Sequence, residues 1–255
     1  MIEMITSLQN NLVKETTQLK QKKYREATGR FFLEGKRAVE EALKVDWQIE
    51  ALFAEERFLS LAEKHAGKFP CYEVTDKIME KLSDTEEPQG IGAVVKIKKQ
   101  AWQDFTCADG LVLVLDGVRD PGNVGTIIRT ADAAGAKAVV LLEDTVDLYN
   151  PKVVRSTMGS IFHLPVFTKV AVPQLKQWCT KQDAALWATS LEGGSDLFSQ
   201  TWPKLTVLVM GSEAQGVRAE LLAEADEKVY IPMKGKAESL NVAVAAGICL
   251  FRGGK

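Results

Sequence analysis

Apolar positions follow two different patterns along the chain, one before about residue 100 and one after it. In the second part, helical segments separate apolar runs that show little alternation with polar residues: LVLVLD, KAVVLLE, LPVF, AALWATS, LTVLVMG and KVYIPM. Such runs are expected for strands covered on both faces of a sheet. The helices are expected at TIIRTADAAG, NPKVVRSTMGSIF and residues 172–181. This alternation predicts a mostly parallel α/β sheet of about five or six strands.

The first part contains shorter elements. Helices are expected at residues 20–28, KRAVEEALK, RFLSLAEKHAG and DKIMEKLSD, and strands at FFLE, IEALFAEE, CYEVT and GIGAVV. These alternating short elements predict a small α/β sandwich. The stretch KIKKQAWQDFTCADG interrupts the pattern and is interpreted as a linker. We therefore predict two domains, residues 1–98 and 109–255.

Charge is distributed unevenly, although the formal net charge is only −2. Residues 1–37 carry eight lysines and arginines against four glutamates, and a local basic stretch can contact phosphate even in an acidic protein. A solvated helix face explains the same charges equally well. The candidates for contact with nucleic-acid phosphate are Lys22, Lys23, Arg25, Arg30 and Arg37.

Several classes of protein are excluded by the residues that the chain lacks. Its cysteines and histidines are Cys71, Cys107, Cys179, Cys249, His65 and His163. Their spacing favours neither a zinc site nor a Ser-His-Asp or Cys-His device. No apolar run approaches the roughly 20 residues that cross a bilayer, and the N-terminal stretch lacks the pattern of a signal peptide. We expect reduced cysteines, no metal, no membrane contact and a cytoplasmic protein.

Residues after each strand are the first candidates for chemistry, because ligands bind outside the carboxyl ends of strands in open α/β sheets. The loop DPGNVG follows LVLVLD and leads into a helix that carries Arg129. Asn123 in this loop can bond locally or to a ligand, and Arg129 is placed to meet an anion such as a phosphate. The loop matches neither GxGxxG nor GxxxxGK[ST], and a plain strand-to-helix turn remains an equal alternative.

Two further strand ends carry polar residues. Thr189 and Ser190 follow AALWA, and a simple turn explains them adequately. The loop GSEAQG follows LTVLVM, and its glycines allow close backbone approach. Because a turn does not need an acidic group, a functional role is favoured for Glu213.

The last loop is the most specific. Residues 231–233 (Ile-Pro-Met) are expected to end a strand, and Ser239 is the expected N-cap of the helix NVAVAAGICLF. Asn241 would then lie in the first helical turn, where an amide is unfavourable unless a partner uses it. The helix is rich in small residues, which suits tight packing against another segment.

Taken in order, DPGNVGTIIRTADAAG, GSEAQGV and IPMKGKAESLNVAVAAGICLF resemble the SpoU family of SPOUT methyltransferases, which includes TrmH-like ribose methylases. The resemblance covers about residues 110–255. The stretch FFLEGKRAVEEAL is similar to the substrate-binding domain often attached to this family. One departure is Ser212, where the family often has asparagine before the glutamate.

The resemblance implies methyl transfer from S-adenosylmethionine to a ribose 2′-hydroxyl of RNA, in a homodimer whose C-terminal chain forms a trefoil knot. The implied cofactor-binding residues are Thr189, Ser190, Leu191, Met210, Gly211, Gly216, Ile231, Met233 and Leu240. The implied catalytic residues are Asn123, Arg129, Glu213, Ser239 and Asn241.

Arginine stays protonated in proteins, which argues against Arg129 as a literal base. Our hypothesis is that Arg129 binds the adjacent phosphate and stabilises the developing alkoxide, while the phosphate or a water shares the proton. Glu213, Ser239 and Asn241 would position the ribose and the loops.

Three alternatives remain open: a transfer RNA methylase, a non-catalytic RNA-binding assembly factor, and a nucleotide-binding α/β enzyme unrelated to methylation. The intact polar set argues against the assembly factor, and the missing GxGxxG and Walker patterns argue against the nucleotide-binding enzyme. The separate N-terminal domain favours ribosomal over transfer RNA.

Overall fold

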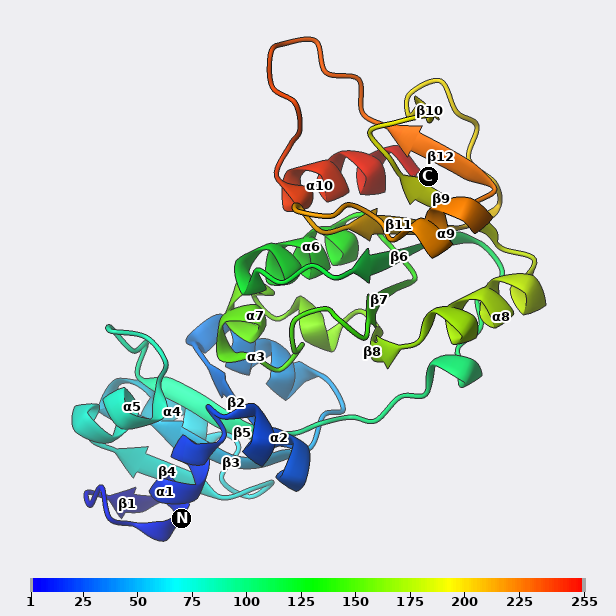
Figure 1. The fold of residues 1–255 in the computed structure, drawn as a ribbon. Coiled ribbons are helices and arrows are strands. Elements are labelled where there is room, and N and C mark those ends of the chain that lie inside the picture. Colours follow the sequence, from blue (N-terminus) through cyan, green and yellow to red (C-terminus); the bar gives the residue numbers. More distant parts are fainter. Residues whose placement is uncertain (1, 254–255) are drawn as a thin grey trace. The chain divides into compact units, whose positions relative to one another are not determined.

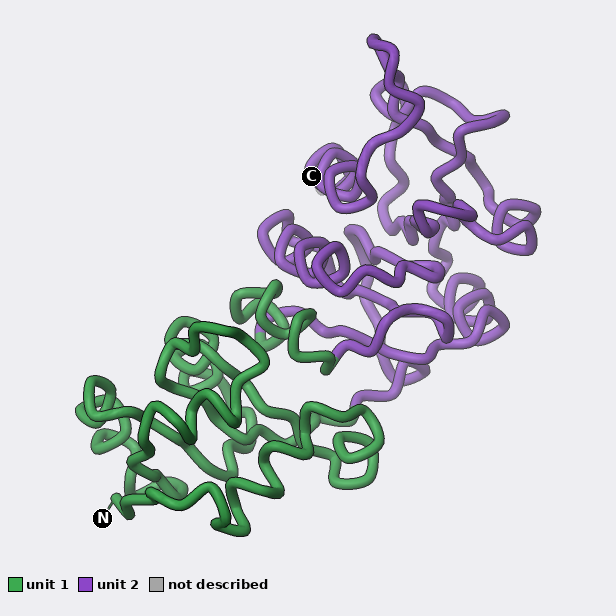
Figure 2. Tube along the Cα trace, turned by 60° about the vertical axis from the view of Figure 1, so that its left-hand side comes forward, with its two compact units in different colours: residues 1–99, 149–162 green, residues 100–148, 163–255 purple. Residues whose placement is uncertain are grey.

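A computed structural model describes residues 2–253, and the chain divides into two compact units (Figures 1 and 2). Unit 1 comprises residues 1–99 and 149–162, and unit 2 comprises residues 100–148 and 163–255. Each unit is built around its own sheet. The α/β fold class predicted from the sequence is confirmed.

Unit 1 contains a five-stranded mixed sheet in the order β1-β4-β3-β5-β2. Its strands are β1 (Glu3–Ile5), β2 (Arg30–Glu34), β3 (Ile49–Ala54), β4 (Cys71–Val74) and β5 (Ile91–Lys96). Its helices are α1 (Asn11–Gln18), α2 (Lys22–Thr28), α3 (Lys36–Lys44), η1 (Glu56–Phe58), α4 (Leu59–Glu63), α5 (Asp76–Leu82), α7 (Pro151–Ser156) and η3 (Ser160–Phe162). Neither β1 nor α1 was expected. Three strand residues with one buried side chain are too few for a pattern, and β1 exists because β4 pairs with it.

Unit 2 contains a seven-stranded sheet in the order β10-β12-β9-β11-β6-β7-β8, and each of its neighbouring pairs is parallel. Its strands are β6 (Gly110–Asp116), β7 (Ala138–Leu142), β8 (Val166–Val170), β9 (Ala185–Thr189), β10 (Ser195–Asp196), β11 (Leu205–Gly211) and β12 (Glu227–Tyr230). Its helices are η2 (Trp102–Asp104), α6 (Pro121–Ala133), α8 (Val172–Gln182), α9 (Ala219–Glu224) and α10 (Val242–Gly253). The extra strand is β10, whose two residues are too short to show a period.

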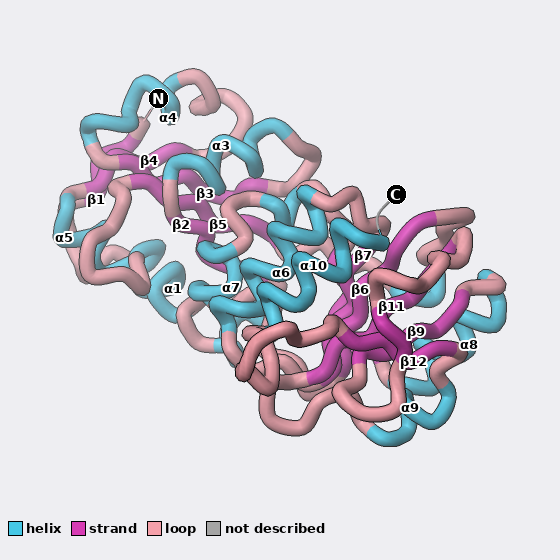
Figure 3. The backbone as a smooth tube through the Cα atoms, turned by 90° about the horizontal axis from the view of Figure 1, so that it is seen from above, coloured by secondary structure: helices cyan, strands magenta, loops and turns pink. Residues whose placement is uncertain are grey.

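Helices cover both faces of the unit 2 sheet, which explains the unbroken apolar runs of its strands. Helices α6 and α10 pack side by side on one face (Figures 1 and 3). On the other face, α8 and α9 contribute side chains to a core shared with β6, β7, β9 and β11. The central strands β6 and β11 are almost entirely buried, as expected for strands covered twice.

The expected linker is in part a packed segment of unit 2. Trp102 is 4% exposed, and its ring lies 4.6 Å from that of Trp178 on α8. Trp178 Nε1 in turn donates a hydrogen bond to the carbonyl oxygen of Phe105 at 2.6 Å. The interpretation of residues 96–110 as a linker between two domains missed this packing, in which two aromatic residues complete the core beneath α8.

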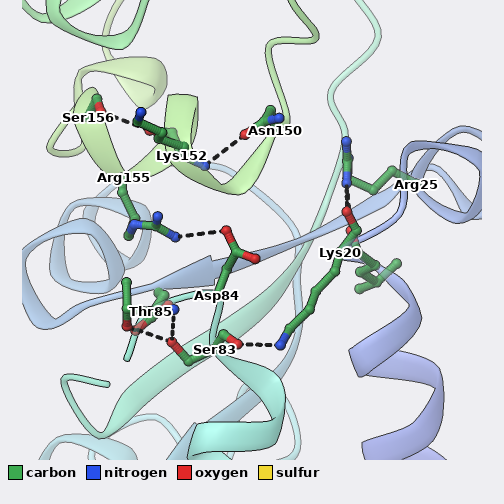
Figure 4. Close-up of polar contacts among 11 residues, drawn as sticks. Lys20, Arg25, Ser83, Asp84, Thr85, Asn150, Lys152, Arg155 and Ser156 are labelled. Carbon is green, nitrogen blue, oxygen red and sulfur yellow. Dashed lines mark hydrogen bonds and ion pairs between the residues drawn. The ribbon is translucent and has the colours of Figure 1, made fainter. Parts of the chain in front are cut away.

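Residues 149–162 lie between β7 and β8 in the sequence, but they pack within unit 1 (Figure 2). The ring of Tyr149 lies 4.9 Å from that of Phe31 on β2, and Arg155 forms a 3.6 Å ion pair with Asp84 (Figure 4). The single helix expected at NPKVVRSTMGSIF is shorter than predicted. It begins after Asn150, whose side chain accepts from the Lys152 N–H, and it ends at Ser156.

The end of α10 is held by a loop of the same unit. Arg252 Nη2 donates to the carbonyl oxygens of Phe198 and Gln200, at 3.2 and 3.1 Å. The trefoil knot implied by the resemblance stays a prediction. Within residues 2–253, no helix is long and apolar enough to cross a membrane.

Candidate active site

A cavity of about 630 Å³ lies in unit 2 at the carboxyl ends of β9, β11 and β12. Most of its lining comes from residues within 189–192, 210–217, 229–233 and 239–245, and Leu197, Leu222 and Cys249 complete it. Parallel strands bring their carboxyl ends to one edge of the sheet, so loops far apart in sequence meet there. All nine residues predicted to bind cofactor line this cavity, and so do Glu213, Ser239 and Asn241.

The loop after β11 folds back tightly on itself. Ser212 and Gly216 form an isolated bridge, and Gly216 has a φ of 65°. A Cβ atom at Gly211 would lie 1.9 Å from the carbonyl carbon of Gly216. Only glycine allows this approach, and the resulting turn presents Glu213 at the cavity.

Three side chains from segments far apart in the sequence are joined by hydrogen bonds. Asn123 Nδ2 donates to Glu213 Oε1, and Asn241 Nδ2 donates to Asn123 Oδ1 at 3.1 Å. Along the sequence, Glu213 lies 90 positions after Asn123 and Asn241 lies 118 positions after it. All three belong to the predicted catalytic set, and the fold therefore brings together three of its five members. Ser239 lines the same cavity.

Asn241, rather than Ser239, caps helix α10. Its Oδ1 accepts hydrogen bonds from the N–H groups of Ala243 and Val244, at 2.9 and 3.3 Å, and the helix begins at Val242. The prediction of Ser239 as the N-cap was wrong by two residues. The cost expected for an amide within the first turn does not arise, because the amide stands at the cap, where its oxygen is favourable.

Helix α6 begins earlier than predicted. Asp120 is its N-cap and accepts from the Asn123 N–H at 2.7 Å, and Pro121 occupies the first turn. The stretch read as a loop is therefore the first turn of the helix, since proline suits that position and glycine does not prevent it. Asn123 is held there with its side chain toward Glu213.

Arg129 lies two turns further along α6 and is exposed. Within residues 2–253 its guanidinium has no hydrogen-bond or ion-pair partner, and it does not line the 630 Å³ cavity. The structure therefore leaves Arg129 apart from the hydrogen-bonded series Glu213–Asn123–Asn241, with all its donors available to another molecule.

A second polar interaction at this edge of the sheet, between Asp116 and Arg218, was not predicted from the sequence. Asp116, at the end of β6, is 4% exposed and accepts from Arg218 Nε, Nη2 and backbone N–H at 2.8, 2.5 and 2.8 Å. These hydrogen bonds raise the pKa of the Arg218 guanidinium above its ordinary value. The signal that could have revealed the link is an aspartate closing the apolar run LVLVLD, since a buried carboxylate requires a partner.

The candidates for RNA contact occupy different environments in unit 1. Lys22, Lys23 and Arg37 are exposed, and Arg30 is about one-third exposed beside Glu50. Arg25 is only 3% exposed, and its Nη1 donates to the carbonyl oxygens of Leu19 and Lys20 (Figure 4). The expectation for Arg25 is corrected, because its guanidinium stabilises the turn between α1 and α2 and is buried away from phosphate.

All four cysteines are free thiols, three of them buried. Cys249 lines the cavity from α10, where burial raises the pKa of its thiol to about 12. A protonated, buried thiol is a poor nucleophile, so Cys249 contributes shape to the cavity and no chemistry.

The cavity fits a ligand with both an apolar and a polar part, as S-adenosylmethionine has. Leu191 is 76% exposed at the cavity and presents apolar surface that a bound ligand can cover. Met233 and Leu240 add apolar surface, while backbone groups of the turn after β11 add donors and acceptors. The volume lies within the usual range of about 300–1,000 Å³ for small-molecule sites.

These features define a parallel α/β domain with a ligand cavity and a polar cluster at one edge of its sheet. Residues 110–251 match the model of the SpoU rRNA Methylase family, and residues 10–93 match that of the MRM3-like substrate binding domain. The chain belongs to the SpoU rRNA methylase family.

Similar proteins and solved structures support this membership. The chain is 36% identical over 250 residues to the 23S rRNA (guanosine(2553)-2'-O)-methyltransferase RlmP of Bacillus subtilis, with 98% of each chain covered. The AdoMet-bound rRNA methyltransferase from Sinorhizobium meliloti has a TM-score of 0.91 and 35% identity, covering 98% of this chain and 97% of that one. The A. aeolicus TrmH/SpoU tRNA modifying enzyme has a TM-score of 0.50 and 31% identity, covering 60% and 77%.

Proposed function

We propose that this protein transfers a methyl group from S-adenosylmethionine to a ribose 2′-hydroxyl of ribosomal RNA, within the large-subunit (23S) RNA. The observation that carries the proposal is the hydrogen-bonded series Glu213–Asn123–Asn241 beside a cavity suited to the cofactor. Family membership and the AdoMet-bound neighbour from Sinorhizobium meliloti support the cofactor. A ribosomal RNA substrate would place the protein in the cytoplasm.

When bound, S-adenosylmethionine supplies a methyl group that is attached to a positively charged sulfur. A ribose oxygen can attack the carbon of this methyl group. The residues predicted to hold it are the nine that line the cavity, with the turn after β11 as one wall. Asn123 holds the Glu213 carboxylate in one orientation, and Asn241 in turn holds Asn123. We propose that these three hydrogen-bonded residues, together with Ser239, align the 2′-oxygen with the methyl group, because in-line transfer depends on alignment.

Arg129 carries the chemistry on the RNA in this proposal. As its proton leaves, the 2′-oxygen develops negative charge, and this charge is consumed when the oxygen bonds to the methyl carbon and S-adenosylhomocysteine departs as a neutral thioether. The exposed guanidinium binds the adjacent phosphate and stabilises that charge. The proton passes to the phosphate or to a water, because arginine itself remains protonated.

We also propose that two copies of the chain form the active enzyme. Val244 and Phe251 on α10 are 54% and 63% exposed, although both are large and apolar. They lie on the helix that packs beside α6, which carries Arg129. A second copy on this surface would bury them and bring more groups close to Arg129.

Ribosomal RNA is favoured over transfer RNA by the extent of the similarity. The two rRNA methyltransferases above match both units of this chain, whereas the tRNA modifying enzyme matches about three-fifths of it. The N-terminal unit, which matches a substrate-binding model, is the part that would select the RNA.

Two measurements test the function. Calorimetric titration should detect binding of S-adenosylmethionine, and no binding at millimolar concentration would overturn the proposal. Mapping of 2′-O-methyl groups in total RNA, with and without the protein, should show one or few positions that depend on it. Absence of any such position would leave the non-catalytic assembly factor as the better interpretation.

The role of Arg129 has its own test. Arg129→Lys keeps the charge but removes the planar fork, so kcat should fall at least about tenfold, while S-adenosylmethionine should bind as before. Arg119→Lys, a neighbouring exposed arginine outside the proposed site, is the matched control. Near-full activity of Arg129→Lys would contradict a role for the fork.

A further inference from the structure

Unit 1 contains a cavity of about 400 Å³ of its own, formed by α1, α2 and three strands of its sheet. All its lining residues belong to unit 1, whereas the methyl-transfer cavity is lined by unit 2 alone. Its volume lies within the range of small-ligand sites. We propose that this cavity binds one unstacked guanine base of the RNA substrate, an inference that rests on the proposed function.

The floor of the cavity is apolar with a single polar exception. Leu19, Ala51 and Val94 line it and are each at most 4% exposed. Thr16 lines it too and is 2% exposed, and among the described residues its hydroxyl has no hydrogen-bond partner. The hydroxyl is not one of the fully buried polar atoms, so it is accessible from the cavity and a polar atom of a bound ligand can bond to it.

The mouth of the cavity presents a donor and an acceptor side by side. Arg30 Nη1 donates to Glu50 Oε2 at 3.4 Å, and the two side chains are 34% and 30% exposed. The second carboxylate oxygen of Glu50 and the remaining N–H groups of Arg30 stay available, since neither residue has another partner among those described. The pair therefore presents hydrogen-bond acceptors and donors side by side to one flat ligand.

An aromatic side chain completes the requirements for a nucleobase. Tyr24, half-buried on α2, lines the cavity together with Arg30 and Glu50. Proteins that recognise single-stranded RNA stack splayed-out bases on aromatic rings and bond their Watson–Crick edges. Lys22 and Lys23 are exposed and directly precede Tyr24, so they can meet the phosphates that flank the base.

Guanine fits this edge better than the other three bases. Its Watson–Crick edge carries one acceptor, O6, next to two donors, N1–H and the 2-amino group. A carboxylate can accept both donors while an arginine donates to O6. Adenine and cytosine offer a carboxylate one exocyclic amine, and uracil offers one imide N–H, so none gives Glu50 two donors.

The test uses the full-length protein and fluorescein-labelled 12-residue RNAs, measured by fluorescence anisotropy. The probes are oligoadenylate, the same strand with one central guanosine, and the same strand with one central inosine, which lacks the 2-amino group. We expect the guanosine strand to bind about tenfold more tightly than the other two. Equal binding of all three, or preference for oligoadenylate, would overturn the proposal.

Variants then connect the preference to the cavity. Glu50→Gln should reduce the preference for guanosine to within twofold, while oligoadenylate binds as before through its phosphates. Thr16→Val, nearly equal in size, should weaken the guanosine strand alone. Glu63→Gln, the same charge change at an exposed position on α4, should behave as the unmodified protein. A guanosine preference that survives Glu50→Gln would refute the assignment.

The outcome is separable from that of the proposed function. If ribosomal RNA is methylated but no base preference exists, the guanine site fails and the methyl transfer stands. If the preference exists and depends on Glu50 while no RNA is methylated, the site stands and the enzymatic proposal fails. Equal unfolding midpoints for all variants exclude loss of folding as the cause.

Discussion

At the scale of single residues, Asn241 combines two tasks that are usually separate. Its side-chain oxygen caps α10, and its amide nitrogen donates to Asn123, which binds Glu213. An aspartate or serine would serve a helix cap as well, since both are preferred at that position. Aspartate has no donor, and serine has its donor and acceptor on one oxygen, whereas the amide carries them on two separate atoms, and this explains asparagine here.

Two substitutions separate these tasks. Asn241→Asp keeps the capping oxygen and adds a charge that the helix N-terminus favours, so stability should hold while methyl transfer falls at least about tenfold. Asn241→Ala loses both tasks and should also lower the free energy of unfolding by about 1 kcal/mol. Urea unfolding and incorporation of labelled methyl groups measure the two effects. Full activity of Asn241→Asp would mean that the link to Asn123 is dispensable.

At the scale of elements, the site depends on how the ends of neighbouring strands are joined. Gly211 of β11 pairs with Asp116 of β6, and Arg218 then closes the loop after β11 by binding Asp116. Because that loop carries Glu213 and lines the cofactor cavity, Arg218 is a positioning residue.

Arg218→Met should weaken binding of S-adenosylmethionine about tenfold and lower the free energy of unfolding by about 1–3 kcal/mol. The loss is smaller than for a fully buried pair because Arg218 is 32% exposed. The double variant Arg218→Met/Asp116→Asn should recover stability but not cofactor binding. Lys176→Met, which breaks a surface pair with α9, is the control. Unchanged cofactor affinity in Arg218→Met would rule out the positioning role.

At the scale of the whole molecule, a nearly neutral chain must bind a polyanion with few cations. In unit 1, the exposed candidates for phosphate contact are Lys22, Lys23 and Arg37. Arg25 is excluded because it is buried, and Arg30 is proposed to bind a base instead. The salt dependence of RNA binding reports how many cations neutralise phosphates.

The three phosphate contacts of unit 1, together with the one proposed for Arg129, predict that log Kobs falls with log salt concentration at a slope of about −3. The double variant Lys22→Gln/Lys23→Gln should reduce the slope to about −1.5. Lys64→Gln/Lys68→Gln, exposed in the same unit but not proposed to meet RNA, should leave it unchanged. Anisotropy titrations of the oligoadenylate strand at several salt concentrations provide the measurement, and an unaltered slope in the first variant would contradict these contacts.

The sequence by itself determined the α/β class, the parallel sheet of unit 2 and the loops that lie at the carboxyl edge of that sheet. These features are predictable because a strand covered on both faces must be apolar throughout, and because parallel strands collect their carboxyl ends at one edge. The nine cofactor residues came from the resemblance to the SpoU family, and all nine line the 630 Å³ cavity.

Only the tertiary structure decided which side chains within that set touch and which are buried. Asn123 meets Asn241 across 118 residues because of how α6 and α10 pack together, and Arg25 is buried by the turn it stabilises. The tertiary structure likewise decided that residues 149–162 pack in unit 1. Local periodicity reports which face of an element is covered, but not by which distant segment, because that choice depends on the packing of the folded chain.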